Sequence, residues 1–374
     1  MNVARMKALL VVPLLAAMTA LPVASTAAST AAPPALAQQG VAVTDPLLRP
    51  ALLAPRALRS VMLGVAAAGT RIVAVGERGI VLWSDDGGKA WQQAAVPVSV
   101  SLTAVSFPNA AEGWAVGHGG AVLHSADGGQ HWTRQFDGRQ AARLELDAAK
   151  ASGDPQRIGR AEQLLGDGPD KPFLAVHFWN SRRGFVMGAY GLIFGTEDGG
   201  ANWTSWNDLV DNPRGLHLNA LYVSGSTLFL VGEQGLLLRS RDDARSFQRL
   251  ESPYPGSWFA VTGRDDTVVL AGLRGTVFSS QDGGTRWSGS VVPMPVSIGS
   301  AIAIPGGFAF ANQSGQVLTS TDGRTLRALA RPPGPPLTAL AMAADGSLLG
   351  ASFAGVQVLP KMNQLKANLP TLLP

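Results

Sequence analysis

Apolar and polar residues alternate in short runs along most of the chain, and glycine-rich turns separate the runs. In the first clear unit the runs at 61–65, 71–75, 81–84 and 91–95 have the length and alternation typical of β-strands. The same arrangement, four short strands in about 40 residues, returns up to residue 360. A module of this size and content is typical of one blade of a β-propeller.

A glycine turn, G-x-x-G, follows an apolar strand in each unit and gives the number of blades. Its final glycines are Gly79, Gly120, Gly191, Gly235, Gly275, Gly315 and Gly355, with intervals of 41, 71, 44, 40, 40 and 40 residues. The last two copies keep only this final glycine. Because one interval exceeds the period by about 30 residues, the sequence predicts seven blades and one insertion. The predicted fold class is therefore all-β, a seven-bladed propeller of four-stranded antiparallel blades.

A second repeated motif, S-x-D-G-G-x-x-W, stands between the third and fourth predicted strands of a blade. Its aspartates are Asp86, Asp127, Asp198, Asp242, Asp282 and Asp322, and the fourth and sixth copies are degenerate. The carboxylate and the preceding hydroxyl can accept backbone N–H groups of their own turn, and the tryptophan can pack between sheets. Since a catalytic or metal-binding group is not needed once per blade, we interpret these aspartates as structural.

The insertion covers about 136–172, between blades 2 and 3, and reads as a helical hairpin. The first helix is expected at 141–151, and Asp154 should cap a second helix with Pro155 at its first position and Gly166 just past its end. One apolar stripe consists of Ile158, Ala161, Leu164 and Leu165. The hairpin should rise from the same face as the glycine turns. It could cap the mouth of the ring or grip a partner, with docking on the propeller as the main role of the stripe.

The last blade offers only three obvious strands, at 337–341, 347–350 and 356–359. We predict that the N-terminal segment 38–55 supplies the fourth strand, from within 40–54, because this closes the ring and removes both sheet edges. The C-terminal tail, 361–374, is the competing source.

Residues 1–37 have the pattern of a secretory signal. Arg5 and Lys7 precede an apolar stretch at 8–24, and Ala35-Leu36-Ala37 is a small-residue cleavage motif. An uncleaved membrane anchor is the alternative. With cleavage before Gln38, the protein is expected to be exported, to a periplasm or a compartment resembling the thylakoid lumen.

The amino-acid composition excludes several classes of structure and function. Hydrophobic residues make up 46% of the 374 residues, which excludes wholesale disorder, and 44 glycines with 25 prolines argue against long helices. The absence of cysteine excludes disulfides, a thiolate metal site, a cysteine nucleophile and a lipoprotein cysteine. A formal charge of +4 is too small to indicate a nucleic-acid partner. We expect no cofactor and no metal site.

The aspartate motif resembles the BNR or Asp-box repeat. Together with G-x-x-G in seven units, it is similar to the photosystem II assembly and stability factor family of propellers, over about 56–360. The resemblance implies a non-enzymatic scaffold that assists the assembly or stability of a membrane protein complex. In photosynthetic organisms the partner would be a newly made reaction-centre subunit, and an accessory role for another membrane complex is equally compatible. We expect a monomer.

The meander predicts which residues face a partner. Turns between strands 2 and 3 share one face with the links between blades, and the aspartate motifs lie on the opposite face. The partner-binding candidates are the residues displayed by the glycine turns: Glu77, Arg78, His118, Tyr190, Glu233, Gln234, Arg274 and Gln313. The alternative is that these side chains are polar only because they face solvent, without a partner. Arg182 and Arg183, on the aspartate side, are expected to lie in a solvated turn.

A sialidase would share the repeat, but its chemistry needs an arginine triad, a tyrosine nucleophile with a nearby glutamate, and an aspartic acid/base. None of Tyr190, Tyr222 and Tyr254 stands in that context, and no nucleophile elbow, zinc motif or phosphate loop is present. We therefore predict no catalytic residues. A glycoside hydrolase or a carbohydrate-binding propeller is the alternative function.

Overall fold

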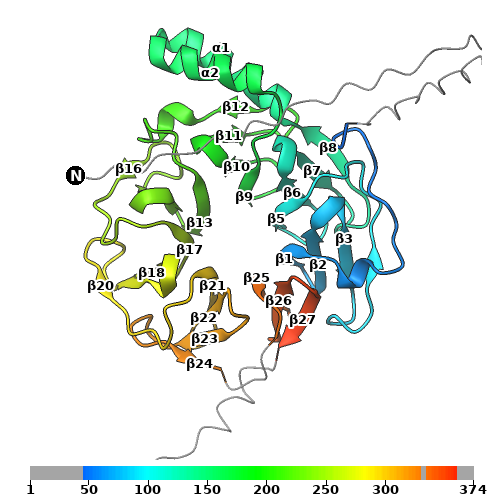
Figure 1. The fold of residues 1–374 in the computed structure, drawn as a ribbon, viewed down its shortest axis with the longest axis vertical. Helices are drawn as coiled ribbons and strands as arrows, with labels where there is room; N and C mark the ends of the chain where they lie inside the picture. The colour runs from blue at the N-terminus through cyan, green and yellow to red at the C-terminus, as the bar shows by residue number, and fades with distance from the viewer. Residues whose placement is uncertain (1–44, 330–333, 360–374) are drawn as a thin grey trace, which may run out of the picture. The chain divides into compact units, whose positions relative to one another are not determined.

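The computed structural model describes residues 45–329 and 334–359, which form a ring of antiparallel sheets around a central axis (Figure 1). Within these residues there are six four-stranded sheets and one three-stranded sheet. In each sheet the strands follow one another in chain order, and the first strands of neighbouring sheets lie side by side around the axis. The predicted seven-bladed propeller is confirmed.

The strands of the first four blades have the following bounds. Blade 1 is β1 (Met62–Ala68), β2 (Arg71–Gly76), β3 (Val81–Ser84) and β4 (Gln92–Gln93). Blade 2 is β5 (Leu102–Ser106), β6 (Gly113–Gly117), β7 (Val122–Ser125) and β8 (Thr133–Phe136). Blade 3 is β9 (Phe173–Phe178), β10 (Gly184–Gly188), β11 (Ile193–Thr196) and β12 (Thr204–Ser205). Blade 4 is β13 (Leu218–Ser224), β14 (Thr227–Gly232), β15 (Leu237–Ser240) and β16 (Gln248–Arg249).

The remaining blades complete the ring. Blade 5 is β17 (Trp258–Arg264), β18 (Thr267–Gly272), β19 (Val277–Ser280) and β20 (Ser288–Gly289). Blade 6 is β21 (Ile298–Ile304), β22 (Gly307–Asn312), β23 (Val317–Ser320) and β24 (Arg327–Ala328). Blade 7 is β25 (Leu337–Met342), β26 (Leu348–Ser352) and β27 (Gly355–Leu359).

Apolar side chains fill the interfaces between neighbouring blades, with one cluster for each interface among the described residues. The second strand of a blade packs against both neighbouring blades, so β2 is buried on both faces and reads as a continuous apolar run. Between blades 2 and 3 the ring of Trp114 stacks on Phe178 with 3.6 Å between centroids. Packing between blades therefore holds the ring together.

Blade 7 packs against blade 1 in the same way, which closes the ring. Met62 and Ile72 share a buried cluster with Leu349 and Ala351. The Thr338 hydroxyl also donates a 2.7 Å hydrogen bond to the Met62 carbonyl oxygen. In the described part of the chain this closure rests on side-chain packing, because the sheet of blade 7 has three strands there.

The N-terminal segment takes a different course from the one predicted. Residues 45–54 contain no strand and run beside the link between blades 1 and 2. The Ala51 N–H donates to the Val96 carbonyl at 2.9 Å, and the Ser99 N–H donates to the Pro46 carbonyl at 2.8 Å. The expectation that this segment pairs with blade 7 is thus wrong for 45–54, because its backbone groups are already bonded to blade 1. Residues 1–44 and 360–374, with the signal, its cleavage site and the alternative strand, lie outside the described residues.

Two helices stand between blades 2 and 3, as predicted: α1 (Gly138–Ser152) and α2 (Pro155–Asp167). α1 begins earlier than expected because Asp137 forms a capping box with Gln140. Asp154 caps α2 as expected, but α2 continues through Gly166 and ends before Gly168, whose φ is 81°. No helix of the described chain is long and apolar enough to cross a membrane.

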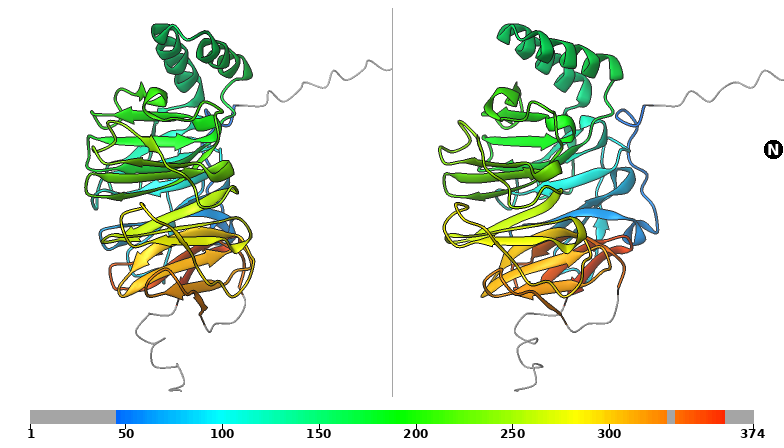
Figure 2. Two further views of the ribbon diagram at one scale, coloured as in Figure 1. Left: turned by 90° about the vertical axis from the view of Figure 1, so that its left-hand side faces the viewer. Right: turned by 60° about the vertical axis from the view of Figure 1, so that its left-hand side comes forward.

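The hairpin of α1 and α2 lies beyond the rim of the ring, outside β12 (Figures 1 and 2). It does not cover the central opening, so of the two roles considered for it, gripping a partner stays a prediction, whereas capping the ring mouth does not fit its position. Ala141, Leu144 and Leu164 lie in or pack against the apolar cluster between blades 2 and 3, and Ala161 is buried. Docking is the main role of this face, as expected, although Leu165 is exposed.

Candidate partner-binding face

All seven glycine turns join the second strand of a blade to the third and therefore lie on one face of the ring, and five of them are tight one-turn helices. They are η2 (Glu77–Gly79), η3 (His118–Gly120), η4 (Ala189–Gly191), η6 (Glu233–Gly235) and η7 (Leu273–Gly275). In each turn the third residue of the motif has a left-handed backbone, as at Arg78 with φ 54° and Tyr190 with φ 57°.

Steric contact explains the two glycines of the motif. A Cβ on Gly76 would overlap the carbonyl oxygen of Val61, which enters the same turn from β1. Gly79 has a φ of 74°, and a Cβ there would overlap the Val98 carbonyl. The motif is therefore a requirement of close backbone approach, and the residues between the glycines are free to vary.

The structure exposes six of the eight predicted side chains: Arg78, His118, Tyr190, Gln234, Arg274 and Gln313. They stand on separate blades and do not converge on one point. Tyr190 is the largest of them, and its side chain is 59% exposed. A partner that contacts several of these positions must extend across the face.

The other two candidates, Glu77 and Glu233, are half-buried and serve the fold. A Glu77 carboxylate oxygen accepts the Val61 N–H at 3.0 Å. Glu233 accepts the His217 N–H at 2.9 Å and pairs with the His217 ring at 2.8 Å. Partial burial raises the pKa of Glu233, but the hydrogen bonds from His217 outweigh it and leave that pKa below its ordinary value. These two glutamates are less available to a partner than the sequence suggested.

A hollow lies between α2 and blade 3. It is a cleft of about 440 Å³. Its walls are α2, the turn at Tyr190 and the loop 207–215, and its lining includes Arg160, Leu164, Lys171 and Arg214. Aromatic, aliphatic and cationic groups thus converge where the insertion meets a glycine turn.

A buried ion pair fixes one wall of the cleft. The Arg157 guanidinium donates to both carboxylate oxygens of Glu145, at 2.9 and 3.1 Å, and also pairs with Asp208. The Ser205 hydroxyl donates to Glu145 at 2.5 Å. The hydrogen bonds that Arg157 donates to Glu145, and then to Asp208, raise the pKa of Arg157, so this guanidinium stays charged. Since Asp208 and Ser205 belong to blade 3, the network holds the hairpin against the propeller.

A row of polar and aromatic side chains continues from the cleft toward blade 4. The Lys171 ammonium lies 4.9 Å from the centre of the Tyr190 ring, and this ring meets His217 edge-on at 5.3 Å. Burial lowers the pKa of Lys171, but Asp170 and Asp167 outweigh it and raise that pKa. These contacts hold the exposed Tyr190 ring in a defined position.

Of the residues that line the cleft, the sequence singled out only Tyr190 as a site residue. Arg160, Lys171 and Arg214 were not identified, because they belong to the insertion, to its exit and to a loop of blade 3. The helical insertion itself was the signal that could have found them, since it must rest on the neighbouring blade.

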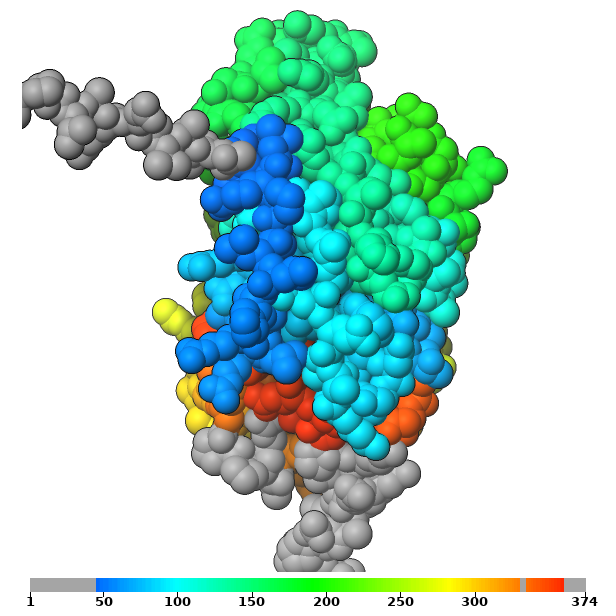
Figure 3. All heavy atoms as spheres, turned by 90° about the vertical axis from the view of Figure 1, so that its right-hand side faces the viewer, coloured from blue at the N-terminus to red at the C-terminus, as the bar shows by residue number. Residues whose placement is uncertain are grey.

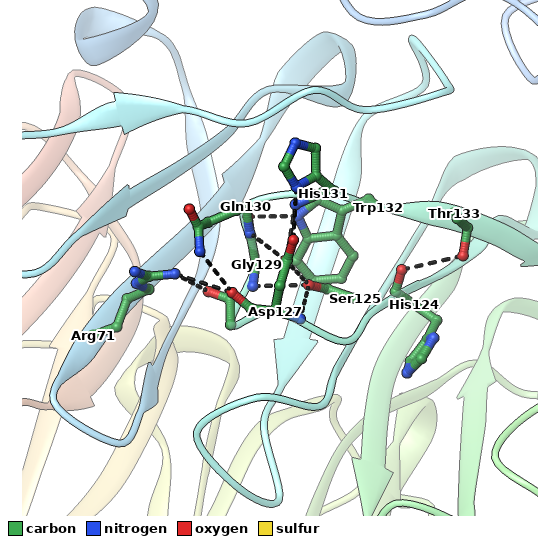
Figure 4. Close-up of polar contacts among 10 residues, drawn as sticks. Arg71, His124, Ser125, Asp127, Gly129, Gln130, His131, Trp132 and Thr133 are labelled. Atoms are coloured by element: carbon green, nitrogen blue, oxygen red, sulfur yellow. Dashed lines mark hydrogen bonds and ion pairs between the residues drawn. The ribbon is translucent and has the colours of Figure 1, made fainter.

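The six aspartate turns join the third strand of a blade to the fourth, on the opposite face, and Figure 4 shows the polar contacts of the turn at Asp127. At Asp127, a carboxylate oxygen accepts the Ser125 hydroxyl at 2.9 Å and two backbone N–H groups further along the turn. The Trp132 indole donates to the Gly129 carbonyl at 2.9 Å. Partial burial raises the pKa of Asp127, but hydrogen bonds from His131, Ser125 and the turn lower it to about 2. This geometry supports a structural role.

Each of five aspartate turns also accepts a hydrogen bond from the preceding blade. The donors are Arg71, Gln135, Arg183, Arg239 and Gln281. Arg183, expected in a solvated turn, is instead largely covered and pairs with Glu197 and Asp243. Arg182 is exposed, as expected.

The three tyrosines, which are the candidates for a sialidase nucleophile, lie in two different places. Tyr222 and Tyr254 pack against the apolar cluster between blades 4 and 5, while Tyr190 stands on the rim of the cleft. Among the described residues there is also no group of three or more His, Cys, Asp or Glu side chains placed to hold a metal ion.

Comparison with known proteins places this architecture in a family. The family model described as "Photosynthesis system II assembly factor YCF48" matches residues 61–160 and 168–315. A curated relative, the photosystem II assembly lipoprotein Ycf48 of Synechococcus sp. (strain CC9902), is 29% identical over 91 residues. That match covers 24% of this chain and 27% of the relative, so it spans about a quarter of the curated protein.

Solved structures share the fold. YCF48 bound to a D1 peptide has a TM-score of 0.59 at 17% identity, over 84% of this chain and 98% of that one. YCF48 from Cyanidioschyzon merolae has a TM-score of 0.59 at 16% identity, over 82% and 98%. A streptogramin B lyase has a TM-score of 0.61 at 12% identity, over 81% and 95%. At these identities the likeness shows the fold alone, but the family model matches more than half of the chain, and the chain therefore belongs to the YCF48 family of photosystem II assembly factors.

Proposed function

We propose that this protein is an exported, non-enzymatic binding protein that assists the assembly or stability of a membrane protein complex. The observation that carries the proposal is the cleft at the junction of α2 and the Tyr190 turn, in a chain of an assembly-factor family. A structure in that family holds a D1 peptide. For this chain we propose the same kind of ligand, an extended segment of a membrane-protein subunit, in photosystem II or in another complex.

The cleft has the chemistry for a segment that carries both an apolar and an acidic side chain. Tyr190 and Leu164 offer apolar surface, and Tyr190 is already held in place by Lys171. Arg160 and Arg214 are exposed at the rim, where guanidinium groups can pair with carboxylates. From the cleft the segment would continue over the exposed turn residues Gln234 and Arg274. The protein would act as a monomer without a cofactor.

Site-specific crosslinking tests this proposal. A photoreactive phenylalanine analogue in place of Tyr190 should capture a membrane protein in intact cells, because this residue lines the cleft and its side chain is exposed. The matched control places the same analogue at Lys89, an exposed residue of an aspartate turn on the opposite face. Equal capture from both positions, or capture of soluble proteins alone at position 190, would contradict the proposal.

The same label gives a second measurement. Replacing Arg160 and Arg214 together with alanine should reduce capture at position 190 several-fold without shifting the melting temperature, because both side chains are exposed. Glycosidase activity is the alternative function. Turnover of a sialoside or another glycoside by the purified protein would favour that alternative over a binding role.

A further inference from the structure

The segment 45–59 lies across the glycine turns of three successive blades. Leu47 packs on Gly119 of blade 2, Ala51 lies beside Gly79 of blade 1, and Leu58 approaches Gly355 of blade 7. In the space-filling view the segment, in dark blue, forms a ridge from the region of the insertion to the red last blade (Figure 3). The segment is therefore part of the glycine-turn face.

Buried side chains, a backbone hydrogen bond and an ion pair hold the segment in place. Leu47 and Ala57 are buried, the Ala51 N–H is bonded to Val96, and Asp45 pairs with Arg139 of α1. Pro50 and Pro55 restrict the backbone between these anchors. Leu47 is the only leucine of the segment among these anchors, since the other four are exposed.

Four leucines of the segment point into solvent instead. The exposed fractions are 61% for Leu48, 82% for Leu52, 70% for Leu53 and 48% for Leu58. Phe353, in the turn of blade 7 beside Leu58, is 55% exposed. Exposed apolar groups of this size on one face mark a surface that is covered by another phase or partner.

The charge around these leucines has one sign. Arg49, Arg56 and Arg59 alternate with them and are exposed, and the chain has no acidic residue from 46 to 76. Asp45 and Glu77, the acids at the two ends, are bonded to Arg139 and to the Val61 N–H. We call Leu48, Leu52, Leu53 and Leu58, with Arg49, Arg56 and Arg59, the leucine–arginine strip.

The shape of the strip favours a lipid surface over a protein. The strip forms a ridge, and its leucines do not line the cleft between α2 and blade 3. A protein partner binds leucines by offering pockets of matching shape, whereas a fluid bilayer accepts projecting apolar side chains without such pockets. Arginines beside the apolar groups suit anionic lipid headgroups.

We propose that the leucine–arginine strip docks this protein on an anionic membrane surface, with the leucines at the headgroup–acyl boundary. This docking goes beyond the proposed binding of a subunit segment. It would turn the glycine-turn face, and with it the cleft, toward the bilayer in which a membrane protein partner lies.

A fluorescent label at Leu52 tests the docking. The full chain contains no cysteine, so Leu52→Cys gives one labelling site at a position where the side chain makes little contact with the fold. With vesicles of phosphatidylcholine and phosphatidylglycerol, an environment-sensitive dye there should shift its emission to the blue and be quenched by nitroxide lipids. Vesicles of phosphatidylcholine alone should give a much weaker response.

The matched control is Lys89→Cys, in the same blade but on the opposite face, and it should not respond. Both labelled chains carry the same N-terminal residues, so a difference between them reports the face and not the leader. Adding Arg56→Gln and Arg59→Gln to the Leu52→Cys chain should lower its partition coefficient roughly 25-fold, since each arginine contributes about fivefold near an anionic surface.

Equal emission changes at positions 52 and 89 would overturn the proposal, and so would a silent label at position 52. A label at 52 that ignores vesicles but responds to a solubilised membrane protein would assign the strip to a protein partner instead. Crosslinking from position 190 is read independently of these results, so failure of membrane docking and failure of subunit binding can be told apart.

Discussion

On the aspartate-turn face the polar side chains are occupied within the fold, whereas on the glycine-turn face most of the residues between the glycines project into solvent. Asp127 is bonded within its own turn, and Arg71 of the preceding blade bonds to its carbonyl oxygen. Tyr190 and Arg274, by contrast, are exposed on turns that the backbone alone specifies. A repeated motif made of side chains leaves few groups to vary, while a repeated motif made of backbone leaves the side chains free for binding.

The largest expected difference between the faces comes from two aromatic residues. Trp132→Ala should lower the free energy of unfolding by about 3–5 kcal/mol, because the indole is buried between blades and bonded to Gly129. Tyr190→Ala, the matched change on the glycine-turn face, should cost less than about 1 kcal/mol. Urea denaturation of both variants measures the contrast, and similar losses would refute it.

Two glycines with the same φ allow the cost of a left-handed backbone to be measured separately from the cost of steric overlap. Gly79 and Gly87 both have a φ of 74°, but a Cβ on Gly79 would meet the Val98 carbonyl, whereas a Cβ on Gly87 would meet nothing within 4 Å. Gly87→Ala should therefore cost about 1–2 kcal/mol from the left-handed backbone alone. Gly79→Ala should cost at least about 2 kcal/mol more. Equal losses in thermal denaturation would show that close approach does not shape the glycine turn.

Acid should destabilise the aspartate turns between about pH 4 and pH 2. The folded pKa of Asp127, Asp198 and Asp242 is lowered from 3.8 to about 2, so the unfolded chain binds more protons between these values. The stability that these carboxylates contribute is complete above about pH 4 and is lost as the pH falls toward 2. The urea midpoint should fall through this window, and in Asp127→Asn it should be lower at pH 6 and fall less.

His177 gives an earlier acid effect that must be separated from this one. Burial lowers its pKa from 6.5 to about 4, so its share of the stability is lost between those values as the pH falls. Comparing Asp127→Asn with the parent chain below pH 4 removes the contribution of His177, because that group is the same in both.

The smallest effect on stability is expected for the exposed arginines of the glycine turns. Arg78→Ala with Arg274→Ala should change the free energy of unfolding by less than about 0.5 kcal/mol per site, because neither side chain is buried. Capture of a membrane partner should weaken all the same. If neither the capture of a membrane partner nor the stability changes, these two arginines are polar surface residues without a role in binding.

Much of the fold could be predicted because its signals are local and repeated. G-x-x-G and S-x-D-G-G-x-x-W each describe one turn whose hydrogen bonds close within a few residues, so their spacing gave the number of blades and the two faces. The exposure of Arg78 and Tyr190 followed from the same turn geometry. Glu77 and Glu233 did not follow, because their partners Val61 and His217 lie one strand away.

The amino-acid sequence by itself determined the repeated module, its turns and the position of the helical insertion, since each depends on neighbours along the chain. Tertiary structure alone decided the path of segment 45–59 over three blades, the outward course of the hairpin and the cleft that α2 forms with blade 3. These features depend on contacts such as Arg157 with Asp208 and Leu47 with Gly119, between residues that no local periodicity relates. The surfaces proposed for function belong to this second group.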